Sequence, residues 1–191
     1  MRSIFLPTLL LAGAAALAAA FVPATSHQAP PAVTKPSPAA SPSEFVPCLW
    51  FDEEAEAAVR HYASVFEGAR ITSEMRSGGA LISAKLAWRG HDLIVLNGNT
   101  KHAFNASASI VVSCKDQREI DRYWDGLVAG GTPTMCGWLE DRFGVSWQVI
   151  PESLSALLGD PDPAKARRVA EAMFQMQKLD LAALERARDG R

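Results

Sequence analysis

The same order of secondary-structure signals occurs twice along this chain, and this repeat restricts the fold more than any other feature. Each half, about 44–98 and about 106–150, contains a strand, an amphipathic helix and three further strands. In the first half these signals lie at 45–51, 52–68, 69–76, 80–88 and 91–97. In the second half they lie at 106–114, 116–131, 132–136, 138–141 and 145–150. The repeat predicts an α+β domain of paired β-α-β-β-β modules.

Acidic residues mark the expected helix starts. Asp52 is placed to cap the first helix. Asp116 is placed to cap the second, with Glu119 three residues later in a variant of the capping box. A helical tail is expected at 151–187, where Asp162-Pro163 combines an N-cap with a proline at the first helical position. Asp180 is placed to cap a last helix.

The N-terminus differs from the rest of the chain. Residues 1–20 have a short basic start, an uncharged apolar stretch and small residues at the end, which predicts a secretory signal peptide. The alternatives are a retained membrane anchor and a wrongly assigned start codon. Residues 21–43 are rich in Pro, Ala and Ser and predict a linker, so the folded domain is expected at 44–187. Cleavage would place the protein in the periplasm or outside the cell, without stable membrane association.

The composition excludes some classes of protein. Nineteen basic and 21 acidic residues give a formal net charge of −2, which argues against a nucleic-acid partner. Three cysteines, at 48, 114 and 136, are too few and too scattered for a disulfide scaffold or a zinc cluster. Cys136 is either a reactive thiol in a loop or a small buried apolar residue, and the sequence favours the second.

Four segments carry a family resemblance. PCLWFDEEAEAAVRHYASVF, LNGN, CGWLEDRFGVSWQVIP and DPDPAKARRVAEAMFQMQKLDLAAL resemble PhnB-like proteins of the vicinal oxygen chelate superfamily, which includes glyoxalases, bleomycin-resistance proteins and extradiol dioxygenases. This subfamily is often labelled 3-demethylubiquinone-9 3-methyltransferase. The resemblance covers about residues 44–187. It implies that the two modules form an open curled sheet around a cleft and that the protein is a homodimer.

The resemblance also implies where a metal would be held in metal-using members. The four ligand positions fall near Phe45, near Leu96 or Asn97, near Ser109 and on Gln148. Only Gln148 is a ligand type of the superfamily, and one amide does not hold a divalent metal. The sequence therefore predicts no metal and no other cofactor. His102, in the loop between the modules, is the one histidine of the folded part that we expect to be able to reach the cleft.

A polar pocket is the resulting candidate site. In the strand at 107–114 the serines alternate with apolar residues, so the apolar face is expected under the helix and the serine face toward the cleft. We predict a pocket lined by Asn97, Ser109 and Gln148, with Phe45 and Trp138 as aromatic walls. The alternative is a polar surface that a dimer partner covers.

The predicted function is binding rather than chemistry. The label of methyltransferase implies a Gly-rich loop after a strand of a doubly wound sheet, and the sequence has no such loop. We expect an exported, metal-free homodimer that binds a small polar or aromatic molecule in its cleft. The alternatives are a metal-dependent enzyme of the glyoxalase/lyase or dioxygenase type, with its ligands elsewhere, and a scaffold whose cleft is filled by side chains.

Overall fold

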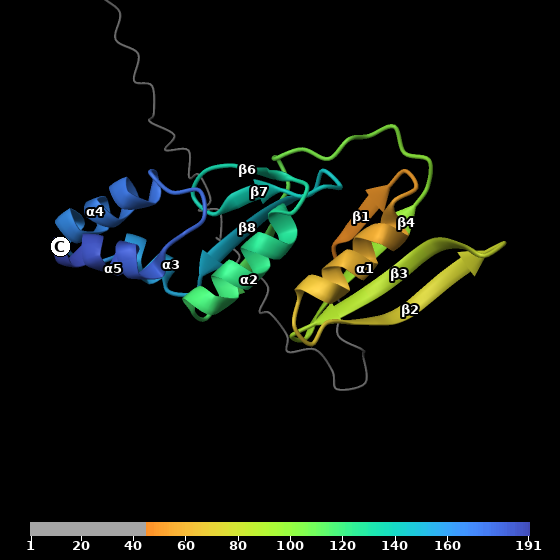
Figure 1. The fold of residues 1–191 in the computed structure, drawn as a ribbon, viewed down its shortest axis with the longest axis horizontal. Coiled ribbons are helices and arrows are strands. Elements are labelled where there is room, and N and C mark those ends of the chain that lie inside the picture. The colour runs from red at the N-terminus through yellow and green to blue at the C-terminus, as the bar shows by residue number, and fades with distance from the viewer. Residues whose placement is uncertain (1–44) are drawn as a thin grey trace, which may run out of the picture. The chain divides into compact units, whose positions relative to one another are not determined.

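The helices and strands follow one another in two similar groups and a helical tail (Figure 1). A computed structural model describes residues 45–191, so the signal peptide and the linker expected at 1–43 lie outside the described residues. The first group is β1 (Cys48–Phe51), α1 (Ala55–Val65), β2 (Arg70–Ser77), β3 (Ala80–Trp88) and β4 (His91–Asn97). The second is β5 (Ile110–Cys114), α2 (Gln117–Val128), β6 (Thr132–Pro133), β7 (Trp138–Glu140) and β8 (Ser146–Pro151). The tail is α3 (Leu154–Leu158), α4 (Pro163–Met173) and α5 (Leu181–Asp189).

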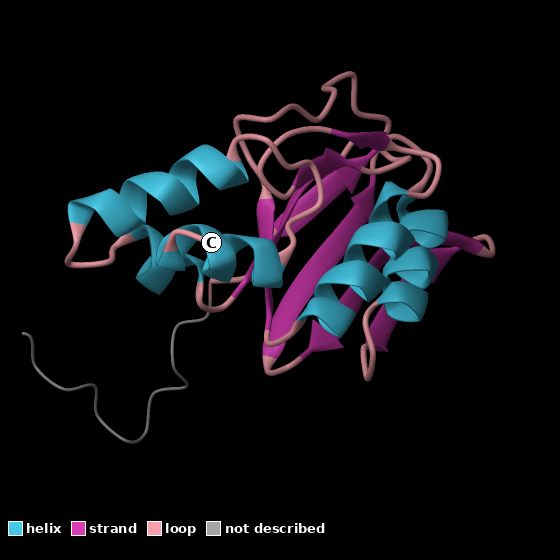
Figure 2. Ribbon diagram, turned by 60° about the vertical axis from the view of Figure 1, so that its left-hand side comes forward, coloured by secondary structure: helices cyan, strands magenta, loops and turns pink. Residues whose placement is uncertain are grey.

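Within the described residues, each group forms a four-stranded sheet with the same topology. The strand orders are β1-β4-β3-β2 and β5-β8-β7-β6. In both sheets the first strand runs parallel to the last, and the other neighbours are antiparallel. Helices α1 and α2 pack against each other and lie on the same side of the strands (Figure 2). The paired β-α-β-β-β modules expected from the sequence are therefore confirmed.

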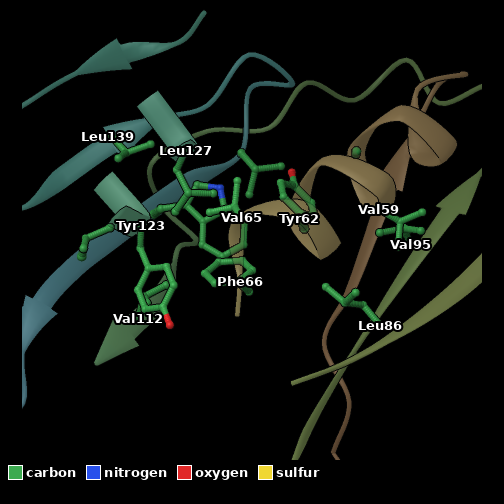
Figure 3. Close-up of a cluster of buried hydrophobic side chains, with 14 of the residues drawn as sticks. Val59, Tyr62, Val65, Phe66, Leu86, Val95, Val112, Tyr123, Leu127 and Leu139 are labelled. Atoms are coloured by element: carbon green, nitrogen blue, oxygen red, sulfur yellow. The ribbon is translucent and has the colours of Figure 1, made fainter. Parts of the chain in front are cut away.

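The two modules share one hydrophobic core. Val59 and Tyr62 on α1 and Ile120 and Leu127 on α2 are each 0% exposed. They belong to a single cluster that draws on both helices and both sheets (Figure 3). Because each helix presents an apolar stripe at i, i+3 and i+4 positions, burial of these stripes removes a large apolar area from water. The shared core makes the modules depend on each other for stability.

The start of α1 differs from the prediction. The helix begins at Ala55, and its N-cap residue Glu54 makes no side-chain capping hydrogen bond. Instead, the backbone N–H of Ala55 donates to Oδ1 of Asn97 at 2.8 Å. The prediction that Asp52 caps this helix is wrong, because an amide from the end of β4 satisfies the first helical N–H in its place.

The start of α2 follows the prediction and extends it. The N–H of Glu119 donates to Asp116 Oδ1 at 2.9 Å, so the predicted cap is confirmed. In a regular capping box the Glu119 carboxylate would also accept the N–H of the N-cap residue, Asp116, but here it does not. It accepts the N–H of Lys115 at 3.1 Å and Nη2 of Arg89 at 2.5 Å. Arg89 lies in the β3–β4 turn, so the cap also joins the two modules.

The tail is anchored to the second module. Its predicted caps are confirmed, since Asp162 accepts the N–H of Ala164 and Asp180 accepts the N–H of Ala183. The N–H groups of residues 136 and 137 donate to the carbonyls of residues 176 and 177 at 2.7 and 2.8 Å. This pairing fixes the end of α4 beside the loop before β7. Among residues 45–191, no helix has the length and hydropathy needed to cross a membrane.

Candidate functional site

The strands of the second module alternate between a covered and an uncovered face, as expected. In β5, Val112 is 1% exposed beneath α2, whereas its neighbour Val111 is 51% exposed on the other face. In β8, Trp147 is buried and Gln148 is half-buried on the opposite face. Ser146 shares the face of Gln148 but is itself buried. The uncovered face is therefore the side of this sheet on which polar side chains are available.

Three of the predicted site residues meet on this face. Nε2 of Gln148 donates to Oγ of Ser109 at 2.9 Å. Trp138 in β7 lies directly opposite Gln148 in the antiparallel ladder. Side chains at directly opposed positions project from the same face of a sheet. The amide of Gln148, the hydroxyl of Ser109 and the indole ring of Trp138 therefore lie together on the uncovered face of the sheet.

A groove lies next to this group, between β1 and β5. It has a volume of about 430 Å³. These two strands are at the edges of their sheets, so the groove runs along the line where the modules adjoin. Its lining combines the hydroxyls of Ser109 and Ser146 and the amide of Asn105 with apolar residues that include Phe104. The Ser109 hydroxyl therefore belongs both to the groove and to the pair with Gln148.

The other two predicted residues are placed differently. Phe45 is 100% exposed and forms no wall of a pocket in this structure. The amide of Asn97 accepts the N–H of Ala55 and donates through Nδ2 to the carbonyl of Leu81 at 3.0 Å. Both ends of this amide hold the start of α1 against β3. The structure thus gives Asn97 a structural task, and it does not bring it into contact with Ser109.

The residues at the four metal-ligand positions do not fit a divalent metal. Phe45 has no donor atom, and the carboxamide oxygen of Asn97 is taken by a helix N–H. Ser109 accepts a hydrogen bond from Gln148. Within the described part of the chain, residues 45–191, no three His, Cys, Asp or Glu side chains gather where they could hold a metal ion. Divalent metals in such sites need several imidazole or carboxylate ligands.

His102 lies at a different pocket. Its ring centroid is 6.3 Å from that of Trp50. Both residues line a cavity of about 290 Å³ beyond the end of β1, together with the carboxylates of Asp52, Glu54 and Glu140. His102 does not line the groove that contains Ser109. The expected approach of His102 to the cleft therefore finds no support in this arrangement.

Asp141 has a role that the sequence analysis missed. Its side chain is buried, at 3% exposure, and accepts four hydrogen bonds. Oδ2 accepts the Tyr62 hydroxyl at 2.7 Å and the Trp147 indole N–H at 2.8 Å, and Oδ1 accepts the N–H groups of Phe143 and Val145. Burial and the nearby carboxylate raise the pKa of Tyr62. Asp141 thus joins α1 of the first module to β8 of the second.

His61 is also more enclosed than its place on α1 suggests. Its position off the apolar stripe of the helix predicts a solvated side chain. Its ring centroid instead lies 5.8 Å from that of Phe143, and Nδ1 is 3.4 Å from Nη2 of Arg142. Burial, and then the charge of Arg142, lower the pKa of His61. The turn between β7 and β8 folds over this side of α1, which periodicity within one helix does not predict.

One protein family matches both modules. Residues 43–150 match the family model described as 3-demethylubiquinone-9 3-methyltransferase. The match ends before α3, so the helical tail lies beyond it, although the resemblance seen in the sequence extended to residue 187. Comparison with curated protein sequences gives no match.

Solved structures resemble rather more than half of the chain. A PhnB protein from Bacillus cereus is 27% identical, with a TM-score of 0.54, and the alignment covers 57% of this chain and 99% of that one. Protein PA1353 from Pseudomonas aeruginosa is 21% identical, with a TM-score of 0.50 and coverages of 58% and 98%. A glyoxalase/bleomycin resistance protein from Albidiferax ferrireducens T118 is 10% identical, with a TM-score of 0.44 and coverages of 56% and 97%.

Proposed function

The chain belongs to the 3-demethylubiquinone-9 3-methyltransferase family, and within it we propose a PhnB-like protein that binds a small polar or aromatic molecule without a metal. The observation that carries this proposal is the pair formed by Gln148 and Ser109 beside Trp138, on a sheet face that no helix of its module covers. A fold of this kind supports several chemistries, so the function has to be argued from the side chains.

The pair selects for a particular ligand chemistry. Gln148 uses one N–H on Ser109, which leaves its carbonyl oxygen and a second N–H for another molecule. A planar group with an adjacent donor and acceptor, such as a carboxamide, matches these two atoms. The Trp138 ring supplies an apolar surface against which an aromatic ring can stack. We therefore expect an uncharged molecule that combines an amide-like edge with a flat ring.

Methyl transfer does not follow from this geometry, despite the family's description. A methyl-donor cofactor is typically held by a Gly-rich loop after the first strand of a doubly wound parallel sheet. Here the first strand is followed by Asp52, Glu53 and Glu54, and each sheet is largely antiparallel. These residues do not fit a bound nucleotide-like cofactor. The proposed role is sequestration or presentation of a ligand.

Export and self-association complete the proposal. The signal-peptide pattern at 1–20 supports a protein that acts in the periplasm or outside the cell. Trp50 on β1 and Met75 on β2 are 44% and 53% exposed. Exposed apolar side chains on open sheet faces favour association with a second copy. A homodimer would cover them.

We expect the purified protein to hold no stoichiometric metal after incubation with Zn²⁺, Ni²⁺, Mn²⁺ and Fe²⁺. The physical reason is the donor set, in which Gln148 is the sole superfamily ligand type at the four positions. Elemental analysis of the dialysed protein, prepared without a chelator, makes the measurement. A stoichiometric metal that is lost in Gln148→Ala would contradict the proposal and point to a metal-dependent enzyme.

Benzamide is a suitable probe of the proposed site, since it combines a carboxamide with one ring. Gln148→Leu is expected to weaken benzamide binding by about tenfold or more, because the variant keeps the size of the side chain but loses both hydrogen-bonding atoms. Calorimetric titration gives the affinities. Gln175→Leu is the matched control, since Gln175 is exposed on the tail. Equal affinities for the two variants would remove the support for a site at Gln148.

A further inference from the structure

A second cavity lies between the modules, on the core side of the two sheets. Its volume is about 260 Å³. It borders the groove described above, since Pro47 and Ile110 line both, but Ser109, Trp138 and Gln148 do not line it. Its wall is formed chiefly by apolar side chains from the C-cap of α1 and from β3, β4, β5 and β8, namely Phe66, Leu86, Trp88, Leu93, Val112 and Trp147.

The two tryptophans of this wall present carbon rather than free polar atoms. The indole N–H of Trp147 donates to Asp141 at 2.8 Å, and that of Trp88 donates to the carbonyl of Glu67 at 3.1 Å. Both donors are therefore already used. The charged lining residue Asp92 is paired with Lys85 at 2.9 Å. His91 is the other polar residue of the lining, so a ligand gains mainly apolar and ring contacts, and a charged ligand would lose favourable hydration.

The size of the cavity and its rings indicate the class of ligand. An apolar protein cavity of roughly 150 Å³ holds one benzene molecule, so about 260 Å³ accommodates a larger, two-ring molecule. The rings of the wall already pack as pairs, with the Phe66 and Trp88 centroids 4.7 Å apart and the Phe66 and Trp147 centroids 5.6 Å apart. A flat aromatic molecule would extend this arrangement with edge and face contacts.

We infer that this cavity is a binding site for an uncharged aromatic molecule of about two fused rings, separate from the site at Gln148. The site opens to solvent at β5, where the lining residue Val111 is 51% exposed. Its lining includes neither Gln148 nor Ser109. The two sites can therefore be tested independently.

Indole is the probe, since it is uncharged and has two fused rings. Calorimetric titration of the full chain is expected to give saturable binding. Val111→Trp, which places a large side chain at the opening, should weaken it by about tenfold or more. Ser113→Trp is the matched control, because Ser113 is exposed on the same face of the same strand and does not line the cavity. This variant should bind indole within about twofold of the wild type.

Two further measurements keep the result decisive. Leu93→Phe narrows the cavity from β4 and should also weaken indole binding. Circular dichroism confirms that each variant is folded. Gln148→Leu should leave indole binding unchanged. No saturable binding of indole to the wild type would overturn the inference. So would a loss caused by Gln148→Leu, since indole would then occupy the other site. Failure of benzamide to bind would leave the indole result unaffected.

Discussion

Asp141→Ala is expected to lower the free energy of unfolding by about 4 kcal/mol, since it leaves several buried donors without an acceptor. These donors are the Tyr62 hydroxyl, the Trp147 indole N–H and the backbone N–H groups of Phe143 and Val145. Each unsatisfied buried donor costs roughly 1–3 kcal/mol, and partial rehydration of the turn reduces the sum. The loss should also separate α1 from β8, because Tyr62 and Asp141 form a bond between the modules.

Urea unfolding of the wild type and the variants measures this effect. Tyr62→Phe removes a single donor and should cost about 1 kcal/mol, whereas Asp141→Asn keeps acceptor atoms and should fall between Tyr62→Phe and Asp141→Ala. Glu140→Ala is the matched control, since Glu140 is the exposed neighbour of Asp141 and should change stability by less than about 0.5 kcal/mol. If Asp141→Ala were no more destabilising than Glu140→Ala, the four hydrogen bonds would not stabilise the joint between the modules.

The prediction succeeded where the information is local in the sequence. Period-two alternation in β5 predicted that Val112 and Val111 lie on opposite faces of the sheet, and the structure buries Val112 and exposes Val111. The caps at Asp116, Asp162 and Asp180 depend on residues two or three positions away, and all three are confirmed. Strand and helix order follow from such signals, and the paired topology follows from their repetition.

It failed where a side chain depends on a residue far away in the sequence. The cap of α1 was assigned to Asp52, but the side chain that accepts the first helical N–H belongs to Asn97, 42 residues away from Ala55 in the sequence. The position of Asp141 just before the turn at Phe143-Gly144 predicts a turn cap and a surface ion pair. The turn cap is confirmed by the N–H groups of Phe143 and Val145. The surface ion pair is wrong, because the Asp141 carboxylate is buried against the hydroxyl of Tyr62, which lies 79 residues away in the sequence. No local pattern of polar residues indicates such a partner.

The most distinctive motif of the chain is thereby explained as structural. GWLEDRFGVSWQ contains Asp141 and three of its four hydrogen-bond partners, and it forms the turn from β7 to β8 around the buried Asp141 side chain. Within it, Gln148 lies on the uncovered sheet face and is paired with Ser109. The motif is therefore a specific marker of the fold, but it says little about which ligand is bound. For this reason the family match establishes the architecture of the chain. The ligand has to be identified by experiments on Gln148.

Glu119 forms the second joint between the modules, and it gives this joint a dependence on pH. Its side chain is 8% exposed and is paired with Arg89, from the β3–β4 turn, and with Lys115. Burial raises the pKa of Glu119, but the hydrogen bonds from Arg89 and Lys115 lower it further, to about 2 from an ordinary 4.5. The folded-state pKa thus lies below the unfolded one. The stabilisation is complete above about pH 4.5 and is lost as the pH falls toward 2.

Glu119→Gln is expected to lower the free energy of unfolding by about 2 kcal/mol at pH 7, because a charge-assisted hydrogen bond to Arg89 becomes a neutral one. Urea unfolding from pH 7 to pH 2.5 should show the two proteins converging below pH 4.5, as the wild-type carboxylate is protonated. Exposed carboxylates such as Glu56 also have a lowered pKa, but they occur in both proteins and cancel in the difference. Glu56→Gln is the matched control and should give a small difference at every pH, since its pairs are exposed. Parallel curves for the wild type and Glu119→Gln would show that the bond between Arg89 and Glu119 does not couple the modules, and the pH dependence would then arise elsewhere.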